Sequence, residues 1–155
     1  MSEDSVPWSS KKKNALLAIG VGGLIAGVLT LLKACIQRGW GVPLTIAEGL
    51  LGPKAEHGGV GTYVLGVFLH FFIAFTAAAV YYAASRRLSF LKQHPLVCGL
   101  YFGATVDLVM LLIVFPLCAF HEASPLPIHD LLLGLLQKMV LVGLPISFSV
   151  RRFAR

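Results

Sequence analysis

Three ionisable residues, His70, Asp107 and Lys138, stand inside long apolar stretches of the sequence. An imidazole, a carboxylate and an amine can pass a proton along when they lie within hydrogen-bond reach, which would make a proton relay or an ion pathway. The same residues could form a buried polar cluster that fixes how helices pack, or Asp107 could stay protonated because burial disfavours its charged form. The choice depends on the elements that carry the three residues.

Those elements are long apolar runs of the chain. Each run reaches the roughly 18–20 residues, at ~1.5 Å rise per residue, that an α-helix needs to cross a hydrocarbon core. Backbone groups inside lipid have no water to bond, and the runs lack the strict alternation of β-strands, so each run is expected to be helical. The predicted transmembrane helices cover residues 15–35, 60–85, 95–120 and 131–150, to within a few residues at each end.

The composition of the 155-residue chain agrees with this prediction. Hydrophobic residues make up 57% and charged residues only 13%, about half the charged fraction of an average soluble domain. The mean hydropathy is +0.81. A small soluble domain needs a charged surface, so this composition argues against a soluble enzyme, a secreted disulfide scaffold and a disordered tail. It predicts one all-α polytopic membrane domain, a bundle of four transmembrane helices over residues 15–150.

The basic residues indicate how the bundle is oriented. The chain has 13 Lys and Arg against 7 Asp and Glu, a formal net charge of +6. Nine of these cations lie on one side of the predicted helices: Lys11, Lys12, Lys13, Arg86, Arg87, Lys92, Arg151, Arg152 and Arg155. The positive-inside rule therefore predicts that the N-terminal segment 1–14 and the basic C-terminus 151–155 are both cytoplasmic. The expected partners of the cations are the bilayer and its anionic headgroups, not nucleic acid.

Small residues mark the faces on which the predicted helices touch, because helices in lipid associate where backbones can come close. The expected packing residues are Gly20, Gly23, Gly27, Gly99 and Gly103. Each of the three ionisable residues lies on the small-residue face of its own helix, so we expect all three to point into the bundle. The face of the first helix could also bind a second copy of the chain or a partner membrane protein.

The depth of the ionisable residues in the membrane constrains which of them can pair. Counting ~1.5 Å per residue from the expected outer helix ends places His70 at ~14 Å, Asp107 at ~20 Å and Lys138 at ~10 Å. Side chains lean toward the N-terminus of their own helix, so Lys138 leans outward and Asp107 inward. A direct Asp107–Lys138 pair is therefore expected to be strained, and an Asp107–His70 pair is somewhat easier.

The segment between the first two predicted helices contains Trp40, which is typical of a membrane-interface anchor. Pro43 can open a short helix over residues 44–51 that lies on the outer surface or dips into it. Three histidines on this outer side, His57, His121 and His129, each have an acidic neighbour in the sequence. Such pairs can bind a metal or sense acidification, but no spacing matches a recognised metal motif, so we expect solvated loop residues.

Cysteines and catalytic motifs give little further chemistry. Cys35 and Cys118 fall near outer helix ends and could pair in an oxidising compartment, whereas Cys98 is on the cytoplasmic side and should stay free. The sequence has no nucleophile elbow, Walker loop, zinc-protease helix or dinucleotide-binding glycine pattern. We therefore expect no enzymatic activity and no cofactor.

A short stretch at the outer end of the first helix resembles a known family. Lys33 followed by Gly39-Trp40-Gly41-Val42-Pro43 is similar to the K…GWxVP stretch of the YagU-like bacterial inner-membrane proteins. A first helix rich in small residues, His70 in the second helix and Pro116 late in the third also look similar. The resemblance implies an inner-membrane location and a four-helix outline. The family has no agreed biochemical activity, so no catalytic residue is implied.

Taken together, these features predict an integral bacterial inner-membrane protein of unknown molecular activity and non-enzymatic role. One alternative is a small proton-linked channel or transporter subunit that uses Asp107, His70 and Lys138. A second alternative is a membrane accessory protein that binds a partner through the glycine face of the first helix. The packing interpretation of the ionisable residues is favoured, because four helices without a lumen leave little room for a solute.

Overall fold

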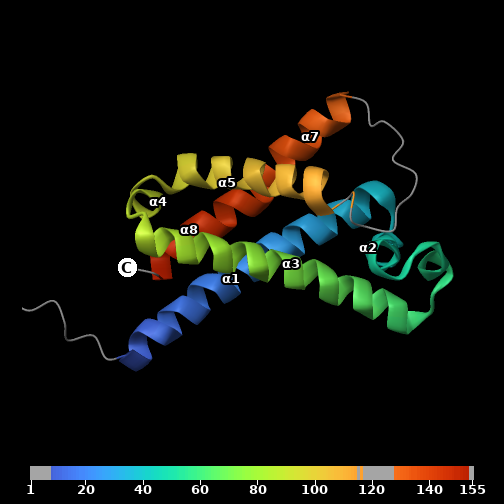
Figure 1. The fold of residues 1–155 in the computed structure, drawn as a ribbon, viewed down its shortest axis with the longest axis horizontal. Helices are drawn as coiled ribbons and strands as arrows, with labels where there is room; N and C mark the ends of the chain where they lie inside the picture. The colour runs from blue at the N-terminus through green and yellow to red at the C-terminus, as the bar shows by residue number, and fades with distance from the viewer. Residues whose placement is uncertain (1–7, 115, 117–127, 154–155) are drawn as a thin grey trace, which may run out of the picture.

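The computed structural model describes residues 8–114, 116 and 128–153, and within these ranges the chain is helical with no β-strand (Figure 1). Four helical segments are long and apolar enough to cross a membrane: Lys12–Arg38, Val60–Arg87, Pro95–Val114 and Ile128–Phe153. The predicted all-α class and the four apolar spans are thereby confirmed. The helices extend past the expected ends in several places, and the fourth span begins at Ile128 rather than at residue 131.

The first two spans are single unbroken helices joined by a structured outer segment. Helix α1 covers Trp8–Arg38 and α3 covers Val60–Arg87. Between them lie α2 (Val42–Leu51) and the 3₁₀ helix η1 (Pro53–His57). The short helix predicted over residues 44–51 is therefore present, with Pro43 in its first turn, where a missing N–H costs nothing. Gly52 ends α2 with a φ of +84°, which glycine adopts without steric cost.

The third and fourth spans are helices interrupted by π-helical turns. Helix α4 (Phe90–Gln93) leads into α5 (Pro95–Val109), which continues as the π-helix η2 (Met110–Val114). The fourth span consists of α7 (Ile128–Lys138), the π-helix η3 (Met139–Gly143) and α8 (Leu144–Phe153). Both interruptions come within a few residues of a charged side chain, Asp107 in α5 and Lys138 in α7.

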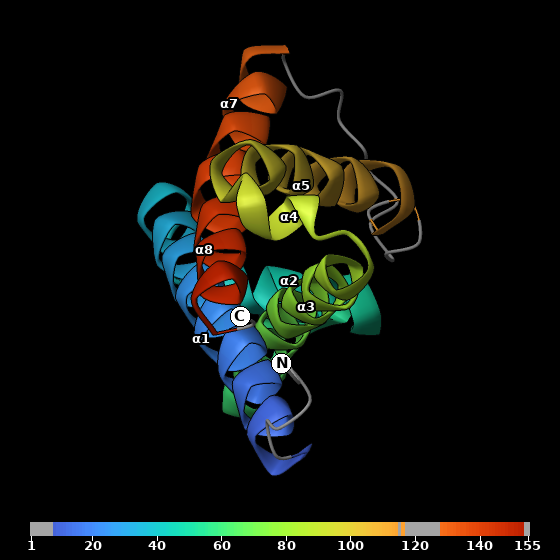
Figure 2. The same cartoon turned by 90° about the vertical axis from the view of Figure 1, so that its left-hand side faces the viewer.

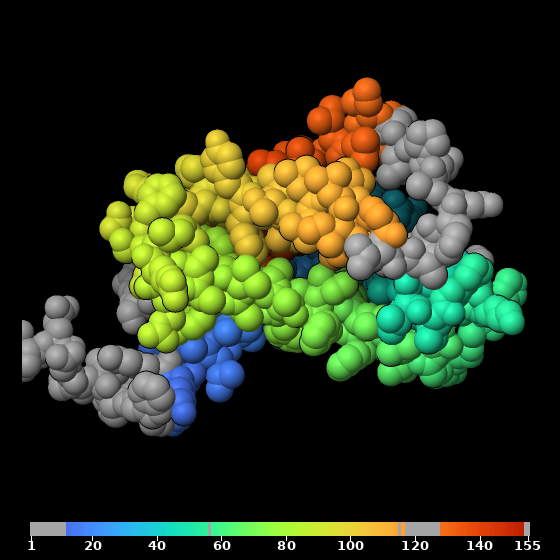
Figure 3. All heavy atoms as spheres, viewed as in Figure 1, coloured from blue at the N-terminus to red at the C-terminus, as the bar shows by residue number. Residues whose placement is uncertain are grey.

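The four spans form two layers. Seen from one end, α1 and α8 lie together on one side of the molecule and α3 and α5 on the other (Figure 2). Helix α1 contacts α3 and α8, and α5 contacts α7, η3 and α8. A hollow separates α5 from α3 on the face shown in Figure 3. These two helices are therefore connected mainly through α1 and α8, which lie behind them.

The buried core lies toward the end of the molecule that carries α4 and the C-terminus. Its buried side chains are Ala18, Ala26, Ala78, Tyr81, Cys98, Val142, Ile146 and Val150. The Tyr81 ring meets the Phe102 ring edge-on, with centroids 4.9 Å apart, and its hydroxyl donates to the Leu91 carbonyl at 3.2 Å. Ser149 Oγ donates to the Ala18 carbonyl at 2.8 Å and so links α8 to α1. The three alanines of this cluster let the helix backbones approach closely.

The same end of the molecule gathers basic residues. The first turns of α1, the α3–α4 connection and the end of α8 all lie there, opposite α2 (Figure 1). The described cations on these segments are Lys12, Lys13, Arg86, Arg87, Lys92, Arg151 and Arg152. Helix α1 already begins at Trp8, so the predicted N-terminal segment 1–14 is helical from that residue onward.

Candidate functional site

Polar side chains from all four spans form a polar belt, which we define as Thr30, Lys33, His70, Asp107, Gln137 and Lys138. The belt contains three side-chain contacts, and each joins a different pair of helices. These contacts are Asp107–Lys138 between α5 and α7, Lys33–Gln137 between α1 and α7, and Thr30–His70 between α1 and α3. The belt therefore ties the four spans to one another inside the apolar region.

Asp107 and Lys138 form a salt bridge in which Lys138 Nζ donates to Asp107 Oδ1. The side chain of Asp107 is 16% exposed and that of Lys138 is 31% exposed, so the carboxylate is the more enclosed partner. An isolated charge at this position would cost several kcal/mol in lipid, and the opposite charge compensates part of that cost. The pair has no formal net charge.

The structure pairs Asp107 with Lys138 rather than with His70, although depth counting favoured His70. The fourth span begins at Ile128, which puts Lys138 ten residues from the helix start, ~15 Å along the axis instead of ~10 Å. In addition, Gly103 packs directly on the fourth span, because a Cβ built on it would lie 2.5 Å from the Lys138 carbonyl oxygen and from Met139 Cα. Asp107 follows Gly103 by one helical turn, so this close approach brings its carboxylate beside Lys138.

His70 makes a separate contact, with α1. Its Nε2 lies 3.0 Å from the Gly27 carbonyl oxygen and 3.1 Å from Thr30 Oγ1. Because a carbonyl oxygen only accepts, Nε2 carries the proton in the bond to Gly27. Within the described ranges, no hydrogen bond or ion pair joins His70 to Asp107. The two residues expected to pair most easily are thus held by different neighbours.

Lys33 completes the belt, and it was not among the site residues predicted from the sequence. Its Nζ donates to Gln137 Oε1 across the α1–α7 contact. It also lies within electrostatic reach of Lys138 and Arg38. The sequence spacing could have indicated Lys33 as a belt residue. Thr30 and Lys33 are three residues apart on α1 and are therefore neighbours on its surface, and Gln137 directly precedes Lys138.

Each belt residue makes at least one of the side-chain contacts named above. In the part of the chain that the structure describes, no buried side-chain nitrogen or oxygen lacks a hydrogen-bond partner. Satisfied polar links of this kind specify one arrangement of helices, because any other register would leave a polar group unpaired in lipid. The geometry is therefore suited to fixing helix positions.

Of the three predicted outer-side histidines, the structure describes His57 and His129, and neither belongs to a group that could hold a metal ion. His57 is exposed at the end of η1, and His129 Nε2 lies 3.1 Å from Asp130 Oδ1 with both side chains largely exposed. His121 and Cys118 lie outside the described residues, so the Cys35–Cys118 pairing stays a prediction. Among described residues there is no group of three or more His, Cys, Asp or Glu that could hold a metal ion.

The predicted packing glycines meet neighbouring helices at all but one position. A Cβ on Gly23 or Gly27 would collide with the ring of Phe75 or Phe71, so α3 covers this face of α1. A Cβ on Gly99 would meet Ser147 and the Gly143 carbonyl oxygen of the fourth span, while Gly103 packs on that span as described above. Gly20 is the exception, because a Cβ at this position would have no neighbouring atom within 4 Å.

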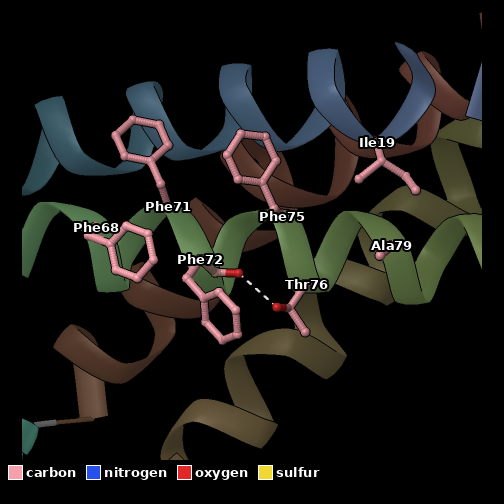
Figure 4. A pocket seen from close by; sticks show the side chains of 7 residues that line it. All are labelled: Ile19, Phe68, Phe71, Phe72, Phe75, Thr76 and Ala79. Atoms are coloured by element: carbon pink, nitrogen blue, oxygen red, sulfur yellow. Dashed lines mark hydrogen bonds between the residues drawn. The ribbon is translucent and has the colours of Figure 1, made fainter. Parts of the chain in front are cut away.

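A cavity of about 380 Å³ runs along α3 (Figure 4). Six of its lining residues come from α3 and one from α1: Phe68, Phe71, Phe72, Phe75, Thr76, Ala79 and Ile19. The Thr76 hydroxyl donates to the Phe72 carbonyl at 2.8 Å, which leaves no strong donor for a ligand. An apolar groove of this kind on a membrane-spanning helix suits a lipid acyl chain and offers no group for catalysis.

Comparison with known proteins gave no match to a protein-family model, a curated protein sequence or a solved structure. The resemblance of the Lys33 to Pro43 stretch to the YagU-like proteins stays a prediction. The polar belt and the distribution of charge are therefore the features from which a function can be inferred.

Proposed function

We propose that the chain is a non-enzymatic, multi-pass protein of a bacterial inner membrane, with both termini in the cytoplasm. The distribution of charge supports the orientation. Seven described cations gather at one end of the molecule, and only Lys33, Arg38 and Lys54 lie on or near the other end. Cytoplasmic segments of membrane proteins carry such an excess of Lys and Arg.

The orientation can be tested by cysteine labelling from outside the cell. The native cysteines are replaced by alanine, and single cysteines are introduced as Ser89→Cys beside α4 and Lys54→Cys in η1, both of which are exposed positions. A membrane-impermeant maleimide is expected to label Lys54→Cys in intact cells and to label Ser89→Cys only after the cells are opened. Labelling of Ser89→Cys in intact cells would contradict the proposed topology.

Within this membrane protein, the role proposed for the polar belt is to hold the four spans in one register. The observation that carries this proposal is that the three side-chain contacts of the belt each join a different pair of spans. In lipid the hydrophobic effect does not drive helices together, so close packing and interhelical hydrogen bonds must do so. We therefore expect that losing both partners of a belt contact destabilises the fold by less than the sum of the two single losses.

A proton-linked channel or transporter subunit is the second candidate. It is favoured by the π-helical turns, because η3 directly follows Lys138 and η2 begins three residues after Asp107. π-Helical turns are rare and occur frequently at functional sites. In this candidate the Asp107–Lys138 pair opens and closes as protons bind.

Proton movement can be measured with purified protein in liposomes that contain a pH-sensitive dye. Flux above that of empty liposomes, lost in Asp107→Asn, is the outcome expected of the second candidate. A Gly134→Ala variant is the matched control, because its position has open space around it and lies on the same helix as Lys138. Absence of flux, or flux that Asp107→Asn leaves unchanged, would exclude a role for the pair in proton movement.

The alternative function, a membrane accessory protein, was expected to bind its partner through the glycine face of α1. Gly23 and Gly27 are covered by Phe75 and Phe71 of the same chain. A partner helix or a second copy would therefore have to dock elsewhere on the molecule.

A further inference from the structure

Two pairs of adjacent arginines lie at the basic end of the molecule. Arg86 and Arg87 are the last two residues of α3, and Arg151 and Arg152 come just before the end of α8. All four side chains are exposed. Membrane orientation depends only on which side the cations lie, and it does not require the two arginine pairs to be close to each other. Closeness of the pairs would therefore indicate a further role.

The fold brings together the helix ends that carry the two arginine pairs. Helix α8 contacts both α3 and α4, and the end of α8 lies beside α3 and α4 when the molecule is viewed from this end (Figure 2). Three partly buried side chains next to the arginines pack against the same core cluster: Tyr82 of α3, Leu91 of α4 and Phe153 of α8. The bond from the Tyr81 hydroxyl to the Leu91 carbonyl fixes α4 against α3.

The described residues that form this end, 12–20, 80–100 and 144–153, include no Asp or Glu. The described acidic residues are Glu48, Glu56, Asp107 and Asp130, which lie in the outer segment or along the spans.

Exposed apolar side chains follow Arg87 closely in the sequence. Leu88 and Phe90 connect α3 to α4, and each is 55% exposed. A surface that presents guanidinium groups and exposed apolar side chains at a membrane-crossing helix end matches a lipid, which has a phosphate headgroup above acyl chains. A free polyphosphate would gain nothing from Leu88 and Phe90.

We infer that this end is a binding site for an anionic phospholipid with two phosphates in one headgroup, of the diphosphatidylglycerol type. A guanidinium group binds phosphate oxygens through two parallel hydrogen bonds, so four arginines at one end of the molecule can hold two phosphates. Basic pockets between transmembrane helices on the cytoplasmic side bind such lipids. The inference rests on the proposed membrane location, and it is independent of what the polar belt does.

The lipid preference can be tested by native mass spectrometry of the full chain released from nanodiscs. One set of nanodiscs contains phosphatidylcholine with 10% diphosphatidylglycerol, and a second set contains phosphatidylcholine with 20% phosphatidylglycerol, so that phosphate and charge are matched. We expect the first lipid to be retained about thirtyfold more than the second, because about two further cations act on one bound headgroup. Equal retention at matched charge would show diffuse attraction and overturn the inference.

Substitutions locate the site. Arg86→Gln with Arg87→Gln, and separately Arg151→Gln with Arg152→Gln, are each expected to reduce retention of the two-phosphate lipid to the level of phosphatidylglycerol. Arg86→Lys with Arg87→Lys keeps the charge but removes the guanidinium geometry, so an intermediate loss is expected. The matched control is Arg38→Gln with Lys54→Gln, which removes two cations from the opposite end.

Three outcomes would contradict the inference. The first is an equal loss of lipid retention in the control variant with Arg38→Gln and Lys54→Gln. The second is full lipid retention in both arginine-pair variants, provided that circular dichroism shows an unchanged helix content. The third is displacement of the lipid by millimolar pyrophosphate, which would indicate a site for free polyphosphate. The cysteine labelling above tests the orientation separately, so a failed orientation and a failed lipid site are distinguishable.

Discussion

Removal of the Asp107 carboxylate by Asp107→Leu is expected to destabilise the folded chain by about 2–4 kcal/mol. The substitution leaves the Lys138 ammonium inside the apolar region without its partner, and an uncompensated charge there is costly. The expected cost is below that of a fully buried pair because Lys138 is 31% exposed and its long side chain can move toward the membrane surface.

The loss can be measured by reversible unfolding in mixed detergent micelles, followed by circular dichroism. Asp107→Asn keeps a hydrogen-bond acceptor while removing the charge, so a smaller loss of about 1–2 kcal/mol is expected. A Thr105→Val control removes a hydroxyl that bonds only within its own helix, to the Tyr101 carbonyl at 2.9 Å, and little change is expected. An Asp107→Leu variant as stable as the wild type would mean that the pair does not hold α5 to α7.

Gly143→Ala is expected to cost about 3 kcal/mol, near the upper end of the usual range for overpacking. A Cβ on Gly143 would overlap the Gly99 carbonyl oxygen, which is backbone and cannot rotate away. Helices α5 and the fourth span would then have to separate, and the nearby Asp107–Lys138 pair would loosen with them.

The matched control for Gly143→Ala is Gly134→Ala, which lies in the same span with nothing within 4 Å of the added carbon. Both substitutions raise helix propensity by the same amount, so the difference between them isolates the collision. The same unfolding measurement compares the two variants. Equal stabilities would show that α5 and the fourth span are not in close contact at Gly99 and Gly143.

The four apolar spans could be predicted from the sequence because membrane crossing depends on length and composition, which a sequence states directly. The small-residue faces of the helices could also be predicted, because the helical period of 3.6 residues per turn decides which residues share a face. The helix that packs against each small-residue face could not be predicted from the sequence. Gly23 and Gly27 face Phe75 and Phe71, and nothing in the spacing of the first helix distinguishes that partner from a second copy of the chain.

The pairing inside the belt could not be predicted because it depends on helix ends and on local winding. A shift of three residues in the start of the fourth span moves Lys138 by ~4.5 Å along the helix axis. The π-helical turns η2 and η3 have no signal in hydrophobic periodicity, and they change which residues face inward after Asp107 and Lys138. Depth counting on ideal helices therefore favoured His70 over Lys138 as the partner of Asp107.

The docking of the outer segment shows the same limit. Pro43 predicts the start of a short helix from its own chemistry, and α2 does begin there. The contact that positions α2 is a long-range one, because a Cβ on Gly66 of α3 would overlap the Pro43 carbonyl group. Gly66 lies one helical turn before His70 on α3, and that spacing alone does not show that α2 packs against it.

The central claim is that the polar belt holds the spans together through pairs of side chains, and a double-mutant cycle at Asp107 and Lys138 tests it most directly. The four proteins are the wild type, Asp107→Leu, Lys138→Met and the double variant, each unfolded reversibly in mixed micelles. We expect the double variant to be more stable than the sum of the single losses implies, with a coupling energy of about 2 kcal/mol. Single losses that add to within about 0.5 kcal/mol would contradict the claim, because independent sites behave in that way.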